Sequence, residues 1–244
     1  ILGKETVSLE ELSTQFSVSM NTIRRDVMEL LSRGNIRKVY GGVSSTLINR
    51  PVGFSVRAQK NSRAKQIIGR LASQLVSDGA SIFLDSGSTT PYILQHIGEK
   101  NGVTVITHSL TALYAASSLS NLNIIALGGI YAPATSSFTG ISTLDALSRL
   151  SIQTIFISAT GVSIENGLTN STYLEAEIKR SVVQRGNRVV LMADQSKFGH
   201  SAVISFCPFE QLYAIVTDCL PSEPYLEAID HYGIRLICPG HESD

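Results

Sequence analysis

Residues 19–43 read SMNTIRRDVMELLSRGNIRKVYGGV, and this stretch decides the fold of the N-terminal part of the chain. Ser19 can cap the start of a helix, because its hydroxyl can accept a hydrogen bond from an amide of the first turn. Apolar side chains then recur at i, i+4, i+7 and i+8, so they share one helix face: Ile23, Val27, Leu30 and Leu31. Gly34 is suited to end that helix.

A shorter helix is expected before this one. Ser8 and Glu11 have the spacing of a capping box, and the apolar face of the helix would consist of Leu9, Leu12 and Phe16. The segment Ser17–Val18 is short enough for a helix-turn-helix corner. After Gly34, Ile36 and Val39 flank Arg37 and Lys38, and the Gly41–Gly42 pair permits a sharp turn. The whole pattern predicts a winged helix-turn-helix.

In such a unit the second helix enters the major groove of DNA by its N-terminal end. We expect base-edge contacts from Asn21, Thr22 and Arg25. Phosphate contacts, which fix position without reading sequence, are expected from Arg24, Arg37 and Lys38, and the capping residue Ser19 completes the candidate DNA surface. The alternative is an ordinary amphipathic helix with a solvated charged face. The helix pair, corner and basic wing occur together, which favours DNA binding.

Residues 18–43 resemble the N-terminal signature of the DeoR family of bacterial transcriptional regulators, close to V-S-x-x-T-I-R-R-D-L followed by a wing ending in G-G. Tyr40 stands where the family usually has His, and Val27 where it usually has Leu. The family normally has about one further helix before the part seen here. Because the chain opens at Ile1, we expect the first helix of the unit to be incomplete.

Charge is distributed unevenly along this neutral chain of 244 residues. Up to Lys65 there are eleven basic residues against five acidic ones, a net charge of +6 that leaves −6 for the remainder. A basic head on an acidic body suits a polyanion-binding head. We expect a DNA-binding domain at 1–45, a linker at 46–55 containing Pro51 and Gly53, and an α/β effector-binding domain at 56–244.

The three cysteines are widely spaced and odd in number, so they indicate neither a metal site nor a disulfide framework. There is no apolar run near 20 residues and no signal peptide. We therefore expect a cytoplasmic protein with no membrane association, no metal and no cofactor.

Beyond residue 56, short apolar runs alternate with helical patterns. The expected strands are 80–84, 103–106, 124–127, 155–157, 189–192, 215–217 and 234–237. The expected helices include a stripe from Ile67 to Val76 and the segments 110–119, 173–183 and 224–232. This alternation predicts a parallel sheet with helices on both faces.

Ligands of such folds gather at the carboxyl ends of the strands. The strand at 80–84 runs into Asp85-Ser-Gly-Ser-Thr-Thr90, after which Pro91 would open a helix. Gly87 lets the backbone come close to a ligand, and the hydroxyls of Ser88, Thr89 and Thr90 would lie beside free amides. The loop therefore predicts an anion cradle, although Ser and Thr also cap helices for structural reasons alone.

Other strand ends carry polar or small residues, including His108, Gly128, Gly161, Glu175 and Lys197. Lys197 can pair with a phosphate as a point charge. Asp85 and Glu175 could accept hydrogen bonds from sugar hydroxyls. Lys179 and Arg180 are expected at the surface, and two roles are open for Asp194, namely binding the ligand or bracing its own turn.

These loops also resemble the effector domain of the DeoR family, whose motifs read D-x-G-T-T, T-N, G-G and D-x-S-K-F. The resemblance implies a sugar-phosphate-sensing fold similar to ribose-5-phosphate isomerase. It also implies binding positions at Asp85, Gly87, Ser88, Thr89, Thr90 and Lys197. Ser88 replaces the usual Thr and keeps the hydroxyl, whereas His108 replaces the usual Asn, which could alter ligand choice.

Three functions are compatible with this sequence. The first is a repressor of a carbohydrate-utilisation operon that binds double-stranded operator DNA under control of a phosphorylated sugar, as a homo-oligomer (dimer or tetramer). The second is a sugar-phosphate isomerase with Asp85, Glu175 or Asp194 as general base. The third is a DNA-bound scaffold with no small ligand. The helix-turn-helix favours the regulator over the enzyme, so no catalytic residue is assigned.

Overall fold

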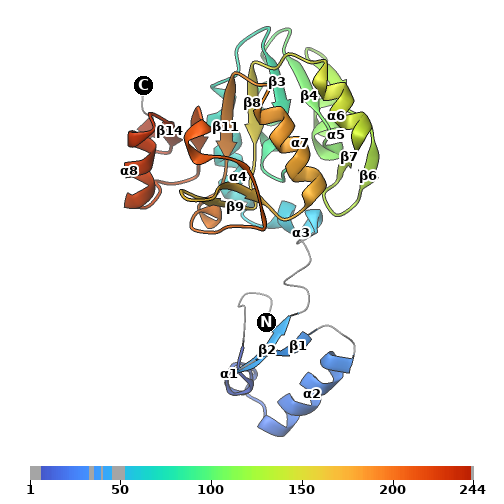
Figure 1. Ribbon diagram of the computed structural model, residues 1–244, viewed down its shortest axis with the longest axis vertical. Coiled ribbons are helices and arrows are strands. Elements are labelled where there is room, and N and C mark those ends of the chain that lie inside the picture. Colours follow the sequence, from blue (N-terminus) through green and yellow to red (C-terminus); the bar gives the residue numbers. More distant parts are fainter. Residues whose placement is uncertain (1–6, 33–35, 40, 46–52, 243–244) are drawn as a thin grey trace. The chain divides into compact units, whose positions relative to one another are not determined.

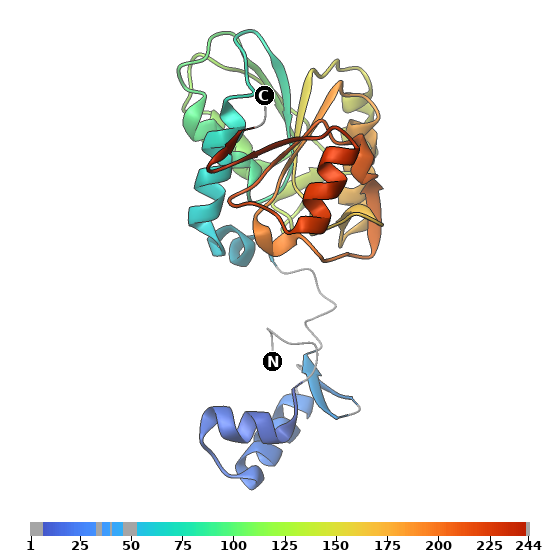
Figure 2. The ribbon, with the colours of Figure 1, turned by 90° about the vertical axis from the view of Figure 1, so that its left-hand side faces the viewer.

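The computed structural model describes residues 7–32, 36–39, 41–45 and 53–242. The chain divides into two compact units, Ile1–Val52 and Gly53–Asp244, which are described here separately as a head and a sensor unit (Figures 1 and 2). The expectations for an additional N-terminal helix, for Gly34 and Tyr40, and for most of the linker fall on residues outside the described ranges. None of the described helices is long and apolar enough to cross a membrane.

The head contains the two expected helices, α1 (Leu9–Phe16) and α2 (Met20–Ser32). Their starts are fixed by side-chain caps. The Glu11 amide donates to Ser8 Oγ at 3.0 Å and the Ser8 amide donates to Glu11 Oε2 at 3.0 Å, which confirms the capping box. At the second helix, the Thr22 amide donates to Ser19 Oγ at 3.2 Å. Between them Ser17 adopts a left-handed conformation that turns the chain.

The apolar faces of both helices meet in a small core with the wing, made of Val7, Leu12, Ile23, Val27, Ile36 and Val43. Leu9, Leu30 and Leu31 pack at its margin, as their spacing predicts. Phe16 was expected on the same face, but it is 62% exposed, so that prediction is wrong. Phe16 is the last residue of α1, and this end of the helix extends past the core.

The wing is an antiparallel pair of strands, β1 (Ile36–Val39) and β2 (Gly42–Ser45). Val7 extends it, because the Val7 and Val43 amides donate to each other's carbonyls at 3.0 Å. The chain turns at Gly41, whereas Gly42 is already the first residue of β2 and pairs with Val39, and each glycine has its own reason. Gly41 has a φ of +86°, and a Cβ on Gly42 would lie 2.2 Å from the Val7 carbonyl oxygen.

The sensor unit is built on an eight-stranded sheet in the order β15-β14-β13-β11-β8-β3-β4-β5, parallel except for β15. Seven of these strands match the runs expected from the sequence: β3 (Ser81–Leu84), β4 (Thr104–Thr107), β5 (Asn123–Ala126), β8 (Thr154–Ile157), β11 (Arg188–Met192), β13 (Ala214–Val216) and β14 (Arg235–Cys238). The α/β prediction is therefore confirmed. The short strand β15 (His241–Glu242) was not expected.

Helices cover both faces of the sheet and produce two apolar layers. One layer lies under α4 (Ser62–Ser73), η2 (Thr90–His96) and α5 (Leu110–Ala116). The other lies under α6 (Ile141–Ser148), α7 (Tyr173–Val183) and α8 (Glu223–His231). Successive strand residues alternate between the layers, since Ile82 and Leu84 belong to the first and Phe83 to the second.

Several short elements that lack a clear sequence pattern are added to the central sheet and its helices. They are a short helix α3 (Phe54–Gln59), a hairpin of β6 (Ile130–Ala132) and β7 (Ser137–Thr139), and an antiparallel sheet of β9 (Gly161–Ser163), β10 (Gly167–Asn170) and β12 (Ile204–Cys207). The segment that Pro91 opens is a 3₁₀ helix, η2, rather than an α-helix.

Candidate functional site

The expected DNA-contacting side chains of the head are largely accessible. Asn21, Arg24, Arg25 and Lys38 are exposed. Arg25 has its Nε 3.6 Å from Asp26 Oδ1, a pair that solvent screens. The Ser19 hydroxyl caps helix α2, and it also lies 2.9 Å from the hydroxyl of the half-buried Thr22. The backbone of Arg37 pairs with Ser44 in the wing, and its side chain is outside the described residues.

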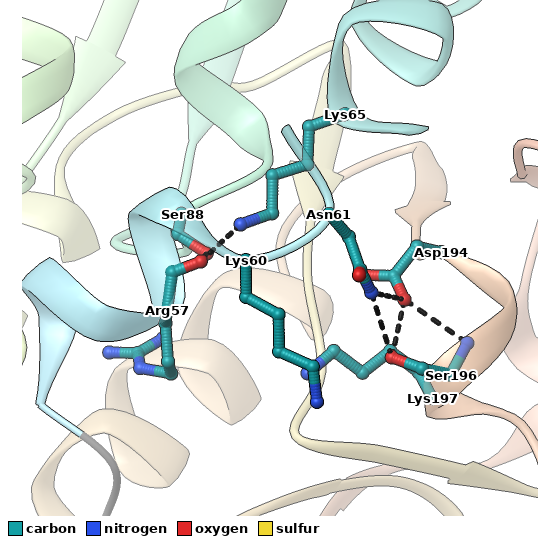
Figure 3. A pocket seen from close by; sticks show the side chains of 8 residues that line it. All are labelled: Arg57, Lys60, Asn61, Lys65, Ser88, Asp194, Ser196 and Lys197. Carbon is teal, nitrogen blue, oxygen red and sulfur yellow. Dashed lines mark hydrogen bonds between the residues drawn. The ribbon is translucent and has the colours of Figure 1, made fainter. Parts of the chain in front are cut away.

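In the sensor unit, a small solvent-open pocket with a cavity volume of about 30 Å³ lies where the α3–α4 corner meets two strand-end loops (Figure 3). The corner supplies Arg57, Lys60, Asn61 and Lys65, the loop after β3 supplies Ser88, and the loop after β11 supplies Asp194, Ser196 and Lys197. The structure thus brings two expected residues, Ser88 and Lys197, into one pocket with three further basic side chains and the Asp194 carboxylate.

The pocket is short of negative charge. Burial lowers the pKa of Lys65 to about 8; the charge of Asp194 opposes that shift, while Lys197, Arg57 and Lys60 add to it. Burial also lowers the pKa of Lys197, and Arg57 and Lys60 again contribute to the shift. Figure 3 shows the Lys60 and Lys197 side chains extending toward the same part of the pocket. Because the cations of this pocket lower one another's pKa, a bound anion would stabilise their charged forms.

Asp194 organises the floor of the pocket. Its Oδ1 accepts hydrogen bonds from Asn61 Nδ2 at 2.9 Å and the Ser196 amide at 3.1 Å, and from the Ser196 hydroxyl. Asn61 itself has a φ of +55° at the corner between α3 and α4. The carboxylate therefore joins the basic corner to the loop that carries Lys197.

Asp85, which was expected at the ligand, lies fully buried behind the pocket. Burial alone would raise the pKa of its carboxyl, but the ion pair with the buried Lys179 holds that pKa below its usual value. The Ser158 amide donates to Oδ2 at 2.9 Å and the Gly87 amide to Oδ1 at 2.7 Å. The Asp85 carboxylate is thus occupied by protein groups.

Glu175 is likewise buried, and its carboxylate is also bound by protein groups. Its carboxylate accepts hydrogen bonds from Ser86 Oγ and Thr172 Oγ1, both at 2.7 Å, and from Asn170 Nδ2 at 3.2 Å. The expectation that Lys179 lies at the surface is wrong. Lys179 is 2% exposed, because it compensates the buried charge of Asp85, and only its neighbour Arg180 reaches solvent.

His108 is also completely buried. Its Nδ1 lies 2.9 Å from the Phe138 carbonyl oxygen, and its ring stacks on Phe83. Burial lowers the pKa of the imidazole. A neutral ring with the Nδ1 proton donated to Phe138 leaves Nε2 as an acceptor, and Nε2 has no hydrogen-bond partner among the described residues.

The remaining expected residues fill internal positions. Thr90 Oγ1 donates within its own loop to Asp85, and Thr89 is 4% exposed. A Cβ on Gly87 would lie 1.8 Å from Ser158 Oγ. The Gly128 carbonyl accepts a hydrogen bond from Thr143, and Gly161 packs against the His200 carbonyl. These groups shape the strand ends and do not line the pocket.

Sequence reasoning missed the α3–α4 corner of the pocket. Arg57, Lys60 and Lys65 were counted with the basic head, whereas they belong to the sensor unit. The sequence does contain a signal for this corner, because a basic cluster at the start of a domain can bind a ligand of that domain. Among the described residues, no group of three or more His, Cys, Asp or Glu is placed to hold a metal ion.

A helix-turn-helix head and an α/β unit with a basic pocket define a two-domain DNA-binding regulator. Residues 1–47 match the family model of the DeoR-like helix-turn-helix domain, and residues 60–219 match that of the DeoR C-terminal sensor domain. The chain belongs to the DeoR family of transcriptional regulators. This confirms the resemblance seen in the sequence.

Characterised relatives agree with this assignment. The chain is 40% identical to the HTH-type transcriptional regulator IolR of Bacillus subtilis, over 97% of this chain and 94% of that one. It is 27% identical to the glycerol-3-phosphate regulon repressor of Escherichia coli, over 94% and 91%. A ribose-5-phosphate isomerase from Methanocaldococcus jannaschii is partly similar, with a TM-score of 0.43 and 21% identity over 57% of this chain and 55% of that one.

Proposed function

We propose that this regulator represses a carbohydrate-utilisation operon and that a phosphorylated sugar bound in the basic pocket changes its affinity for operator DNA. The observation that carries the proposal is the pocket itself, where four basic side chains surround one carboxylate. Lys and Arg suit a phosphate, and the Ser88, Asn61 and Asp194 side chains can bond sugar hydroxyls beside it. The names of relatives, among them a glycerol-3-phosphate regulon repressor, support the substrate class.

The position of the pocket in the chain supports coupling to the head. The sensor unit begins at Gly53, and Arg57 and Lys60 already belong to the pocket. Helix α3 therefore connects the linker to the ligand site directly. A ligand that contacts Arg57 would favour one placement of α3, and its preference for that state sets the size of the response.

An isomerase remains the alternative from another class. The carboxylates named as possible bases, however, are held by protein groups. The pKa of Asp85 is below its usual value because of Lys179, which makes its carboxylate a weak base near neutral pH. An assay for aldose–ketose interconversion with pentose and hexose phosphates tests this directly, and turnover would defeat the regulator-only interpretation.

The decisive experiment measures binding of full-length protein to upstream DNA with and without a panel of phosphorylated sugars. We expect one phosphosugar to shift DNA affinity, while its unphosphorylated parent does not. A ligand present at about 100 times its dissociation constant should also stabilise the protein by about 2.7 kcal/mol. If no compound changed either DNA affinity or thermal stability, the scaffold function would be favoured.

The variant Lys197→Ala separates ligand binding from DNA binding. We expect it to weaken the response to the active phosphosugar by about tenfold or more while operator affinity without ligand stays unchanged. The matched control is Lys100→Ala, which removes a lysine outside the pocket. An equal loss in both variants, or an unchanged response in Lys197→Ala, would remove the lysine from the site.

Cysteine chemistry supports a proposal about the cellular location. Cys207, Cys219 and Cys238 are all free thiols, and burial raises the pKa of Cys207 to about 12, which keeps that thiol protonated. Free, unreactive thiols fit a reducing compartment. We therefore include a cytoplasmic location in the proposal.

A further inference from the structure

Lys197 lies in a short loop after β11 that runs from Asp194 to Gly199, and we name this segment the Lys197 loop. Its middle forms a 3₁₀ turn, Gln195–Lys197, and Lys197 is half-buried where it lines the basic pocket. A lysine side chain has many rotamers, so a fixed backbone reduces the entropy that is lost when its ammonium pairs with an anion. The groups that fix this loop therefore affect ligand binding.

The first half of the Lys197 loop is fixed by two carboxylates. Asp194 is 2% exposed and accepts a hydrogen bond from the Ser196 amide inside the loop. The Gln195 amide donates to Asp218 Oδ1 at 2.9 Å, and Asp218 belongs to the segment that follows β13. These bonds restrain the chain before Lys197, whereas the residues after it need a restraint of their own.

The second half of the loop is fixed by one side chain from α8, Tyr225. The Gly199 amide donates to the Tyr225 hydroxyl at 2.8 Å, and this hydroxyl donates to the Val162 carbonyl in β9 at 2.9 Å. The Tyr225 ring also meets the Phe198 ring nearly edge-on, with the ring centroids 5.1 Å apart. Tyr225 thus contacts both residues that follow Lys197 in the loop.

Tyr225 is itself held in place by the core. The residue is 8% exposed, and its ring packs on the buried Phe209 with centroids 6.1 Å apart. A buried phenol is stable where its hydroxyl both donates and accepts a hydrogen bond, and the Tyr225 hydroxyl does both. The core therefore fixes the hydroxyl, and the hydroxyl fixes the end of the Lys197 loop.

The pattern of hydrogen bonds separates this restraint from the stability of the fold. The Gly199 amide also donates to the Val162 carbonyl, at 3.0 Å. Loss of the Tyr225 hydroxyl would therefore leave neither backbone group without a partner, so the cost in stability should be small. The connection of the loop to α8 would be lost, and the ligand would then have to order Lys197 on binding.

We propose that Tyr225 is a positioning residue for phosphate recognition, because it holds the Lys197 loop in the conformation that directs the Lys197 ammonium into the basic pocket. The inference rests on the proposed function, in which Lys197 binds the phosphate group. Tyr225 is distant from Lys197 in the sequence and does not line the pocket. It acts on the ligand only through the loop.

Titration of the full chain with inorganic phosphate tests this role, with binding followed by the NMR shift of the Ser88 amide. We expect Tyr225→Phe to raise the dissociation constant for phosphate by about threefold or more, while the midpoint of thermal unfolding stays nearly unchanged. In a Lys197→Ala background the same change should have no further effect, because positioning matters only while the ammonium is present. A purely structural role would not produce this dependence on Lys197.

The matched control is Tyr232→Phe. Tyr232 follows α8 and its ring also packs on Phe209, but it is outside the contacts of the Lys197 loop, so this variant should bind phosphate like the wild type. Hydrogen exchange provides a measurement that needs no ligand. The Phe198 and Gly199 amides should exchange faster in Tyr225→Phe than in Tyr232→Phe.

Two results would overturn the positioning role. One is unchanged phosphate affinity in Tyr225→Phe, and the other is an equal loss of affinity whether residue 197 is Lys or Ala. Failure of the proposed function would look different, since the Ser88 amide of the wild-type protein would then not respond to phosphate. That result would reject the pocket as a phosphate site and the role of Tyr225 with it.

Discussion

Lys179 and Asp85 form an ion pair in the interior of the sensor unit, and both side chains are nearly inaccessible. The Lys179 ammonium also donates to the Ser158 carbonyl at 2.7 Å, so helix α7 and the ends of β3 and β8 meet at one charge. Each charge is tolerable there only because the other is present. The Lys179–Asp85 pair therefore helps to hold the conformation of the loop after β3, which carries Ser88.

Replacing Lys179 by Met should destabilise the protein by about 3–5 kcal/mol, because it leaves the Asp85 carboxylate buried without its partner. Denaturant unfolding of the two proteins measures the difference. The control is Arg180→Met, which removes the neighbouring half-exposed cation and should cost about 1 kcal/mol or less. A similar cost for the two variants would show that burial of the pair is not what matters.

Lys65 gives the pocket a predictable response to pH. Its folded pKa of about 8 lies below the ordinary 10.5, so the folded state loses this proton first as pH rises. The unfolded chain then binds more protons between about pH 8 and 10.5, and on that account stability rises with pH there. An anion near Lys65 should raise its pKa again.

Phosphosugar affinity should therefore be highest below about pH 8 and fall as pH rises through it, with proton uptake on binding above that value. Calorimetry in two buffers of different ionisation enthalpy measures the uptake. The Lys65→Met variant should lose this part of the pH dependence. Identical profiles for variant and wild type would place the ligand away from Lys65.

At the scale of elements, the wing depends on one close backbone approach. Strand β2 lies against Val7, and Gly42 is the residue that allows it. Gly42→Ala should destabilise the head by roughly 1–3 kcal/mol, since the added Cβ must displace the Val7 carbonyl. Operator affinity should fall while phosphosugar binding persists.

The control for this change is Gly53→Ala, where an added Cβ meets nothing within 4 Å. Titration of labelled operator DNA and thermal unfolding compare the two variants. Unaltered DNA affinity in Gly42→Ala would mean that the wing tolerates a shift at Val7.

The sequence predicted elements well where burial dictates a pattern. Strands β8 and β11 are apolar at every position after the first because helices cover both faces of the sheet, and such runs can be recognised in the sequence. The three-residue strands β6 and β9 are too short for a period to show. Helix α3 begins inside the expected linker at 46–55, where Pro51 and Gly53 suggest irregular structure, and most of the helix lies beyond that linker.

The pocket was predicted only in part, for a different physical reason. Strand-end loops are found by local composition, which identified Ser88 and Lys197. The basic residues of the α3–α4 corner, such as Lys60, lie far from Lys197 in the sequence. The packing of α3 and α4 brings them close to it. Buried partners such as Lys179 resemble surface residues until the carboxylate that they neutralise is located.

At the scale of the whole molecule, the two units should be separable by mutation. Arg25→Ala should lower operator affinity by roughly 1–3 kcal/mol and relax specificity at one position, if the side chain contacts a base edge. Phosphosugar binding, measured by calorimetry, should not change. An equal loss on every DNA sequence would make Arg25 a phosphate contact instead.

Helix α3 is only six residues long, yet two different contacts converge on it. Arg57 on α3 lines the basic pocket, and the Phe54 amide at its start donates to the Ala134 carbonyl in the β6–β7 turn at 3.1 Å. Occupancy of the pocket and movement of the β6–β7 turn would thus act on the same short helix. Thermodynamic reciprocity then requires that, if the small molecule moves α3, a change that moves the β6–β7 turn must alter how tightly the small molecule is held.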